Sequence, residues 1–145
     1  MKTSFLIVLI LILTQISCDN DDEANSALYS TWEAKTFVSV ESVAYPKNED
    51  AVISLIFRKD GTYSLKLDVN SCGGSFTLDK NNQIEIESPA CTEACCDSKF
   101  SEKLAMMISK VTSYSISGNT LKLNVPQWGY IECEIFSSSL INPHP

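Results

Sequence analysis

Short runs of alternating apolar and polar residues, separated by turn residues, limit the chain after residue 30 to a β-rich fold. The clearest run spans residues 63–69. Its apolar face carries Tyr63, Leu65, Leu67 and Val69. The run follows Asp60-Gly61, a dipeptide that favours a tight hairpin turn. Strands joined by such turns pair with their chain neighbours, so we expect an antiparallel sheet.

The same patterning predicts about eight strands. They are expected at residues 32–40, 51–58, 63–69, 75–78, 83–87, 113–117, 121–125 and 130–136. We interpret residues 70–74, which include Gly73 and Gly74, as a turn, and the cysteine-rich segment after Pro89 as a loop.

A single amphipathic helix is expected from Asp97 to Lys110, with Asp97 or Ser98 as its cap. Its apolar residues fall at helical spacing and form one stripe. The stripe consists of Phe100, Leu104, Met107, Ile108 and Val111. We therefore predict a mainly β (α+β) domain, a curled antiparallel sheet or barrel-like structure whose helix covers one opening or face.

The first 17 residues are predicted to be a signal peptide. Lys2 precedes nine consecutive apolar residues, 5–13, which span about 14 Å as a helix and are too short to cross a bilayer. The following Ser17-Cys18 resembles the lipobox of bacterial lipoproteins, which implies that Cys18 is lipidated and becomes the mature N-terminus. The alternative is an ordinary secretory signal whose cleavage leaves a cysteine nearby.

Residues 18–27 are expected to be a lipidated cysteine followed by an acidic tether. Four carboxylates within residues 19–23 leave little apolar surface to bury, so the segment favours a solvated spacer. It is also similar to the surface-export signal of some Gram-negative lipoproteins. The globular domain is expected at 28–137 and a loose tail at 138–145. We expect a lipid-anchored protein of the outer membrane in the cell envelope, on its periplasmic face or at the cell surface.

Charge and histidine content exclude several classes of function. The formal net charge of −7 disfavours nucleic acid, which is bound through Lys and Arg. The one histidine, His144, lies next to the C-terminus, so no oriented imidazole is expected within the domain. We predict no enzyme activity and no cofactor.

Residues from Trp32 to Phe136 resemble the META-domain family of bacterial secreted and lipid-anchored proteins, which includes the HslJ-like proteins. The residues that carry the resemblance are Trp32, 57–63, 70–76, 94–97, Phe100, Leu104 and 111–123. The segment 70–76 departs from the family's usual Gly-Cys-Asn, and extra cysteines precede the helix. The resemblance implies a compact antiparallel, barrel-like domain with roles in envelope stress or at the surface, and no catalytic residue.

The cysteines are expected to be structural. Cys133 lies on the apolar face of its strand and is expected to be a buried free thiol. The remaining four are disulfide candidates. They are Cys72, Cys91, Cys95 and Cys96. Because a bridge between neighbours is strained, we expect Cys95 and Cys96 each to bond a different partner, one Cys72 and the other Cys91.

Metal binding is the alternative for this loop. Cys91, Cys95 and Cys96, with Cys72, Glu93 or Asp97 nearby, offer soft ligands to Cu(I) or Zn(II). Thiols outside the cytoplasm tend to oxidise and the spacing lacks a Cys-x2-Cys pair, so we predict no metal.

Trp128 and Tyr130 form a candidate binding loop for a ligand or partner, the alternative being that Trp128 plugs one end of the barrel. We predict a non-catalytic binding or structural domain, anchored to the membrane by lipid, with a protein or small molecule as partner. A carrier of a small hydrophobic ligand in a lipocalin-like barrel is the runner-up, and it requires an empty interior.

Overall fold

The computed structural model describes residues 26–137. The nine strands in this part of the chain are β1 (Thr31–Ser39), β2 (Ser54–Phe57), β3 (Thr62–Lys66), β4 (Ser71–Asp79), β5 (Gln83–Ile86), β6 (Ala90–Cys91), β7 (Ser113–Ser117), β8 (Thr120–Val125) and β9 (Gly129–Ile135). One helix, α2 (Lys99–Met107), continues as a 3₁₀ turn, Ile108–Lys110. The predicted signal peptide, Cys18, the acidic residues of the tether and the tail at 138–145 lie outside the described residues.

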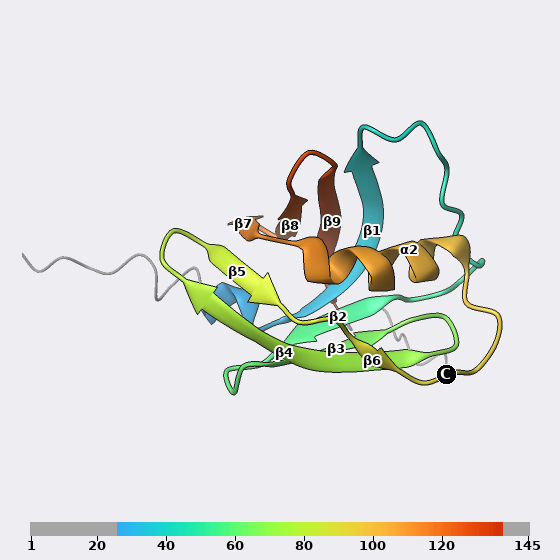
Figure 1. Ribbon diagram of the computed structural model, residues 1–145, viewed down its shortest axis with the longest axis horizontal. Helices are drawn as coiled ribbons and strands as arrows, with labels where there is room; N and C mark the ends of the chain where they lie inside the picture. Colours follow the sequence, from blue (N-terminus) through green and yellow to red (C-terminus); the bar gives the residue numbers. More distant parts are fainter. Residues whose placement is uncertain (1–25, 138–145) are drawn as a thin grey trace, which may run out of the picture.

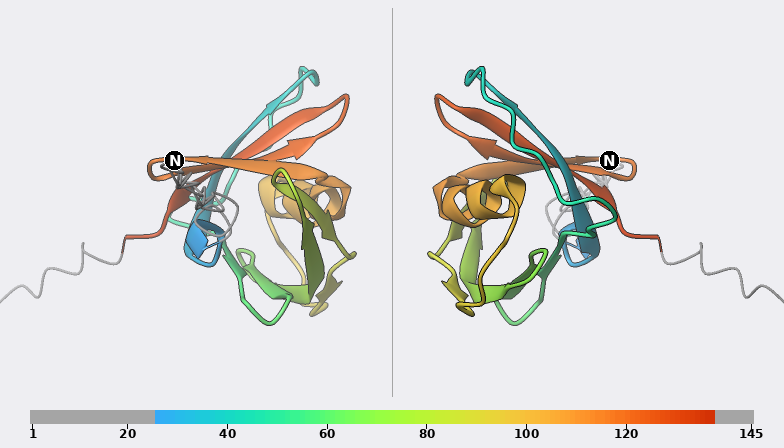
Figure 2. Two further views of the ribbon diagram at one scale, coloured as in Figure 1. Left: turned by 90° about the vertical axis from the view of Figure 1, so that its left-hand side faces the viewer. Right: turned by 90° about the vertical axis from the view of Figure 1, so that its right-hand side faces the viewer.

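All nine strands belong to one antiparallel sheet that closes on itself. The strand order is β3-β2-β1-β9-β8-β7-β5-β4-β6, and an additional pairing of β3 with β4 completes a ring of eight strands. Figures 1 and 2 show the ring and the short β6 at its edge, beside β4. The prediction of a mainly β, antiparallel, curled fold is confirmed.

The shortest strand pairing in the ring is the one between β5 and β7. Only Gln83 and Ser113 are in register there, flanked by hydrogen bonds from Ile84 N to Thr112 O (3.1 Å) and from Tyr114 N to Asn82 O (3.0 Å). Between these two strands the chain leaves the ring to form β6 and α2. Figure 2 shows α2 between the two halves of the ring, where it covers this opening.

The predicted apolar stripe of the helix faces the ring. Phe100, Leu104, Met107, Ile108 and Val111 are all buried. The helix begins two residues later than expected because Ser98 is its N-cap, and the Ser98 hydroxyl accepts a hydrogen bond from Ser101 N at 3.3 Å. The helix assignment and one of its two candidate caps are confirmed.

Side chains fill the interior of the ring. The bulkiest fully buried residues are Trp32, Tyr63, Phe57, Leu28, Ile53, Leu55, Leu65, Leu104, Ile108, Leu121, Leu123 and Ile131. Cys133 is also fully buried as a free thiol, as predicted, and burial raises its pKa to about 12. A hollow of about 450 Å³ over β4, β5 and Thr112 is mainly polar at its surface. The filled interior does not favour the hydrophobic-ligand carrier.

The predicted turn at residues 70–74 is wrong, because β4 already begins at Ser71. Gly73 and Gly74 lie within β4, and their lack of a side chain allows Tyr63 of the neighbouring strand β3 to pack closely against them. A Cβ on Gly74 would lie 2.9 Å from the Tyr63 ring, and one on Gly73 would lie 3.2 Å from the Tyr63 carbonyl oxygen. Tyr63 uses the space to donate a hydrogen bond to Glu87 O at 2.7 Å.

Two further expectations about the strands need correction. Val69 is half exposed, because β3 ends at Lys66 and the chain turns over residues 67–70 instead of continuing the alternation. The loop after Pro89 contains the short strand β6, which gives nine strands where about eight were predicted. Residues 26–28 form a helical turn, in which Leu28 is fully buried.

Gly129→Ala tests the close packing of β9 against β1. A Cβ at Gly129 would lie 1.9 Å from Val38 O, and the φ of +141° disfavours other residues. Strain and overpacking together predict a loss of roughly 3 kcal/mol in the free energy of unfolding. Gly118→Ala is the control, since its φ is +57° but nothing lies within 4 Å, and about 1 kcal/mol is expected. Equal losses in urea unfolding would contradict the predicted clash.

Candidate functional site

Three loops meet at the N-terminal end of α2. They are the β1–β2 loop (residues 40–53), the β3–β4 turn (67–70) and the β6–α2 loop (92–98). Phe100 N donates to Pro46 O at 3.2 Å, and Ser98 N donates to the Asp68 carboxylate at 2.8 Å. The helix start therefore fixes two loops that are far apart in the sequence.

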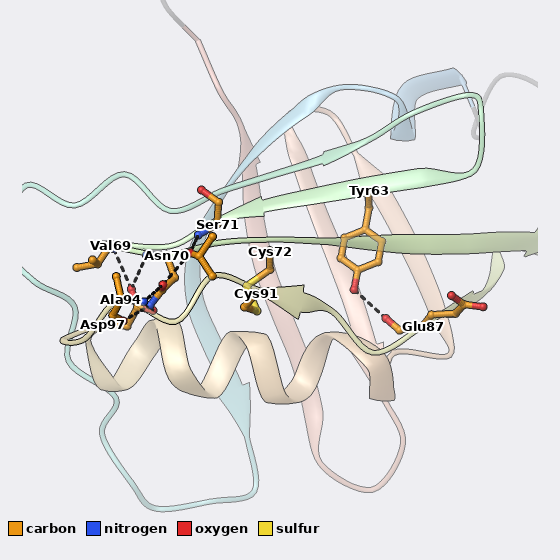
Figure 3. Close-up of a disulfide and its surroundings, with 10 residues drawn as sticks. Tyr63, Val69, Asn70, Ser71, Cys72, Glu87, Cys91, Ala94 and Asp97 are labelled. Atoms are coloured by element: carbon orange, nitrogen blue, oxygen red, sulfur yellow. Dashed lines mark hydrogen bonds between the residues drawn. A yellow bond between two sulfur atoms is a disulfide. The ribbon is translucent and has the colours of Figure 1, made fainter.

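The β6–α2 loop is joined to the ring by one disulfide, Cys72–Cys91 (Figure 3). Antiparallel pairing of β4 and β6 places these residues opposite each other, with their Cα atoms 4.0 Å apart. The predicted pairing of Cys95 and Cys96 with these two cysteines is therefore wrong, because Cys72 and Cys91 already bond each other. Cys95 and Cys96 are exposed free thiols.

The side chain of Asn70 holds the same loop in place, and both its amide nitrogen and its amide oxygen are fully hydrogen-bonded. Its amide nitrogen donates to Ala94 O and to an Asp97 carboxylate oxygen, both at 2.7 Å. Its oxygen accepts from Ala94 N and the Thr92 hydroxyl, both at 2.8 Å. Figure 3 shows this cluster beside the first turn of the helix. Asn70 is only 7% exposed, so its polar atoms need these partners.

Two carboxylates complete this junction. Asp97 accepts from Val69 N at 2.8 Å and from Asn70 N at 3.2 Å, so it anchors the β3–β4 turn instead of capping the helix. Partial burial favours a higher pKa for Asp68, but the hydrogen bonding of its carboxylate, chiefly with Ser98, outweighs it and lowers that pKa. Negative charge next to a helix N-terminus is electrostatically favourable.

A second group of side chains, here called the aromatic–lysine cluster, surrounds the other face of the helix start. It comprises Phe37, Tyr45, Lys47, Phe100, Lys103 and Trp128. Phe37 stacks on Phe100 with ring centroids 4.3 Å apart and contacts the Tyr45 and Trp128 rings edge-on, each at 5.6 Å. The cluster packs the β1–β2 loop against α2 and the β8–β9 turn.

Both lysines of the cluster lie over aromatic rings. Lys47 Nζ is 4.4 Å from the centroid of Phe100 and donates a hydrogen bond to Ala34 O. Burial lowers the pKa of Lys47. Lys103 Nζ lies 5.0 Å from the Tyr45 ring and 5.3 Å from the Trp128 ring. These cation–π contacts join the β1–β2 loop to α2, and the two ammonium groups need not be fully buried to make them.

Glu41 links the cluster together. Its carboxylate accepts from the Tyr45 hydroxyl at 2.6 Å and forms an ion pair with Lys103 at 2.9 Å. The hydrogen bonds from Tyr45 and Lys103, together with the nearby Trp128 indole, lower the pKa of Glu41 to about 2. The Trp128 N–H lacks a partner at good hydrogen-bond geometry within residues 26–137, so we assign the effect mainly to the first two donors.

A hollow of about 250 Å³ opens beside this cluster. Its walls include Lys35, Phe37, Tyr45, Lys47 and Phe100. Aromatic faces, ammonium groups and the Glu41 carboxylate together suit a small polar group or a side chain of a partner protein.

The structure separates the two residues of the predicted binding loop. Trp128 is 8% exposed and packs within the cluster, so it fills the end of the structure, the alternative stated above, and is not an exposed anchor. Tyr130 is half-buried, with Lys122 Nζ 4.6 Å from its ring. It pairs with Val38, whereas Phe37 pairs with Ile131, so Tyr130 and Phe37 point to opposite faces of the sheet.

The metal-binding alternative for the cysteine-rich loop required several free cysteines close together. Cys72 and Cys91 are consumed by their disulfide. Within residues 26–137, no group of three or more His, Cys, Asp or Glu side chains is placed to hold a metal ion.

Sequence reasoning missed Glu41, Tyr45, Lys47 and Lys103 as parts of a site. The first three lie in an irregular loop without periodicity, and Lys103 lies on the polar side of the predicted helix. No pattern in the sequence links the loop residues to Lys103, because five strands separate them from α2 and they meet only when the loop folds over the helix start.

The described part of the chain is a small closed antiparallel sheet covered by one helix. A family model described as the META domain matches residues 26–129. The chain belongs to the META domain family.

A crystal structure of a DUF4847 family protein from Bacteroides vulgatus has a similar fold, with a TM-score of 0.56 and 16% sequence identity. The similarity covers 74% of this chain and 92% of that protein. No curated protein matches the chain. Within residues 26–137, no helix has the length and hydropathy that a membrane span requires.

Tyr45→Phe tests the role assigned to Glu41. Because the folded pKa of Glu41 lies below its ordinary value of 4.5, the interaction stabilises the loop above pH 4.5 and is lost as the pH falls through about 2. Removing the Tyr45 hydroxyl should raise the pKa of Glu41 toward 4.5 in a carboxyl-detected NMR titration. Tyr130→Phe, on the outer face, should leave it unchanged. A Glu41 pKa near 4.5 in the unsubstituted protein would refute the assignment.

Proposed function

We propose that the protein is a lipoprotein of the bacterial cell envelope, whose META domain is a non-catalytic binding or structural module. Acyl chains on Cys18 would anchor it in the outer membrane, and residues 19–27 would link the anchor to the domain. The role would be envelope maintenance or a response to envelope stress. The observation that carries the anchor is Ser17-Cys18, which follows the apolar run at residues 5–13 and resembles a lipobox. The position of the two described chain ends indicates how such an anchor would orient the domain.

Both described ends lie at one end of the β1–β9 pair. Trp32 pairs with Ile135, and Phe136 N donates to Thr31 O at 2.8 Å. The β1–β2 loop and the β8–β9 turn lie at the opposite end, where Ser39 pairs with Gly129. The nine residues of β1 separate the two ends by roughly 30 Å.

A tether entering at Thr31 would thus orient the domain. From Cys18 to Leu28 the chain can extend at most about 35 Å. An anchored domain would stand close to the bilayer with its chain ends facing the lipid and with the aromatic–lysine cluster facing away. In this orientation the hollow beside Phe37 and Lys47 would be open to soluble partners.

A non-catalytic role is supported by the chemistry of the described side chains. The Cys133 thiol is fully buried and its pKa is raised, so it is a poor nucleophile. Glu41, the one acid whose pKa is lowered as far as about 2, is engaged by Tyr45 and Lys103 and remains ionised at neutral pH, which does not suit a general acid. The META domain family is also not known as a catalytic family.

Metabolic labelling with a fatty acid tests the anchor. The full chain should incorporate the label and sediment with outer membranes in high salt, whereas Cys18→Ser should do neither. Cys95→Ser is the matched control, because it removes an exposed cysteine from the folded domain and should remain labelled. Release of the unsubstituted protein as an unlabelled soluble domain would contradict the proposal. Protease treatment of intact cells then distinguishes the cell surface, where the domain is cut, from the periplasmic face.

A further inference from the structure

The two cysteines of the β6–α2 loop that the structural disulfide leaves free are neighbours in sequence. Cys95 and Cys96 are both exposed, whereas Cys133 is buried far from solvent. Because they are consecutive residues, their thiols lie side by side along the chain at one exposed tip. Two accessible thiols on neighbouring residues are the reactants of a vicinal disulfide.

The backbone on each side of the pair is held in place. Ala94 is fixed through both its N–H and its carbonyl by Asn70, and Asp97 is fixed by Val69 N and by Asn70. Cys95 and Cys96 are therefore a two-residue tip between fixed ends. This frame limits the approach of either cysteine to Cys72 or Cys91.

The backbone of the tip is unusual. Cys96 has a φ of +86°, a conformation that residues other than glycine rarely adopt. Strained conformations of this kind persist where the surrounding structure enforces them, and they occur often at functional sites. Here hydrogen bonds with Asn70 and from Val69 N hold the residues on both sides of the pair.

We propose that Cys95 and Cys96 form a reversible redox site, which is oxidised to a vicinal disulfide by exchange with the disulfide of a small thiol compound or a partner protein. In the first step, a thiolate of the pair attacks the partner disulfide, forms a mixed disulfide and releases one partner thiolate. In the second step, the other cysteine attacks the mixed disulfide and releases the second partner thiolate. The pair loses two electrons and two protons, and the partner disulfide is reduced to two thiols.

The vicinal disulfide differs from Cys72–Cys91 in stability. Exposed and strained disulfides have higher reduction potentials and are the labile ones, whereas Cys72 is 5% exposed and lies within a paired strand. The loop therefore combines a permanent disulfide with one that is formed and reduced as conditions change. This inference does not depend on the lipid anchor or on the proposed binding role.

A redox titration of the full chain tests the site. The protein is equilibrated in buffers of reduced and oxidised glutathione, quenched with acid, alkylated and analysed by intact mass and peptide mapping. We expect Cys95 and Cys96 to be joined in the more oxidising buffers and free in the more reducing ones, while Cys72–Cys91 stays formed throughout. Linkage of Cys95 or Cys96 to Cys72 or Cys91, or free thiols at both positions in every buffer, would overturn the proposal.

Single substitutions test whether both cysteines take part in the exchange. Cys96→Ser and Cys95→Ser each lack the second thiol, so each should accumulate a glutathione adduct on the remaining cysteine, about tenfold more than the unsubstituted protein accumulates. Both residues are exposed, so both variants should keep the melting midpoint of the unsubstituted protein. No adduct on either variant, or as much adduct on the unsubstituted protein as on the variants, would refute exchange at this site.

Discussion

The fully satisfied side chain of Asn70 is the interaction on which the α2 end of the molecule depends. A buried amide that lost these partners would pay the full cost of desolvation. Because its four hydrogen bonds reach Thr92, Ala94 and Asp97, one side chain fixes the path of the whole β6–α2 loop. That path determines where the helix begins.

The helix start in turn positions the rest of this end. Ser98 caps α2 and donates its N–H to Asp68, and the first turn supplies Phe100 to the aromatic–lysine cluster. The β1–β2 loop then folds over that turn through Glu41 and Lys47. The proposed binding surface and the proposed redox pair therefore both depend on the junction at Asn70, although they use different loops.

Local patterns predicted the regular elements well. Alternation at Tyr63 and the apolar stripe through Leu104 reflect burial, which a single strand or helix already displays in sequence. The misses are long-range. Gly74 stands within a strand because the Tyr63 ring, eleven residues away, occupies the space that a side chain would need. Cys72 bonds Cys91 because β6 pairs with β4. The site at the helix start was mostly not predicted, since its residues come together only after the ring closes.

Hydrogen exchange of Asn70→Ala tests the central claim most directly. Asn124→Ala is the control, because the Asn124 side-chain amide donates to Ser113 Oγ within the ring and not to the β6–α2 loop. The account predicts that the amides of Thr92, Ala94 and Ser98, which donate to Ser71 O, Asn70 Oδ1 and the Asp68 carboxylate, lose protection in the first variant alone. The Ile84 and Tyr114 amides between β5 and β7 should stay protected. Unchanged exchange at the β6–α2 loop in Asn70→Ala would contradict the account.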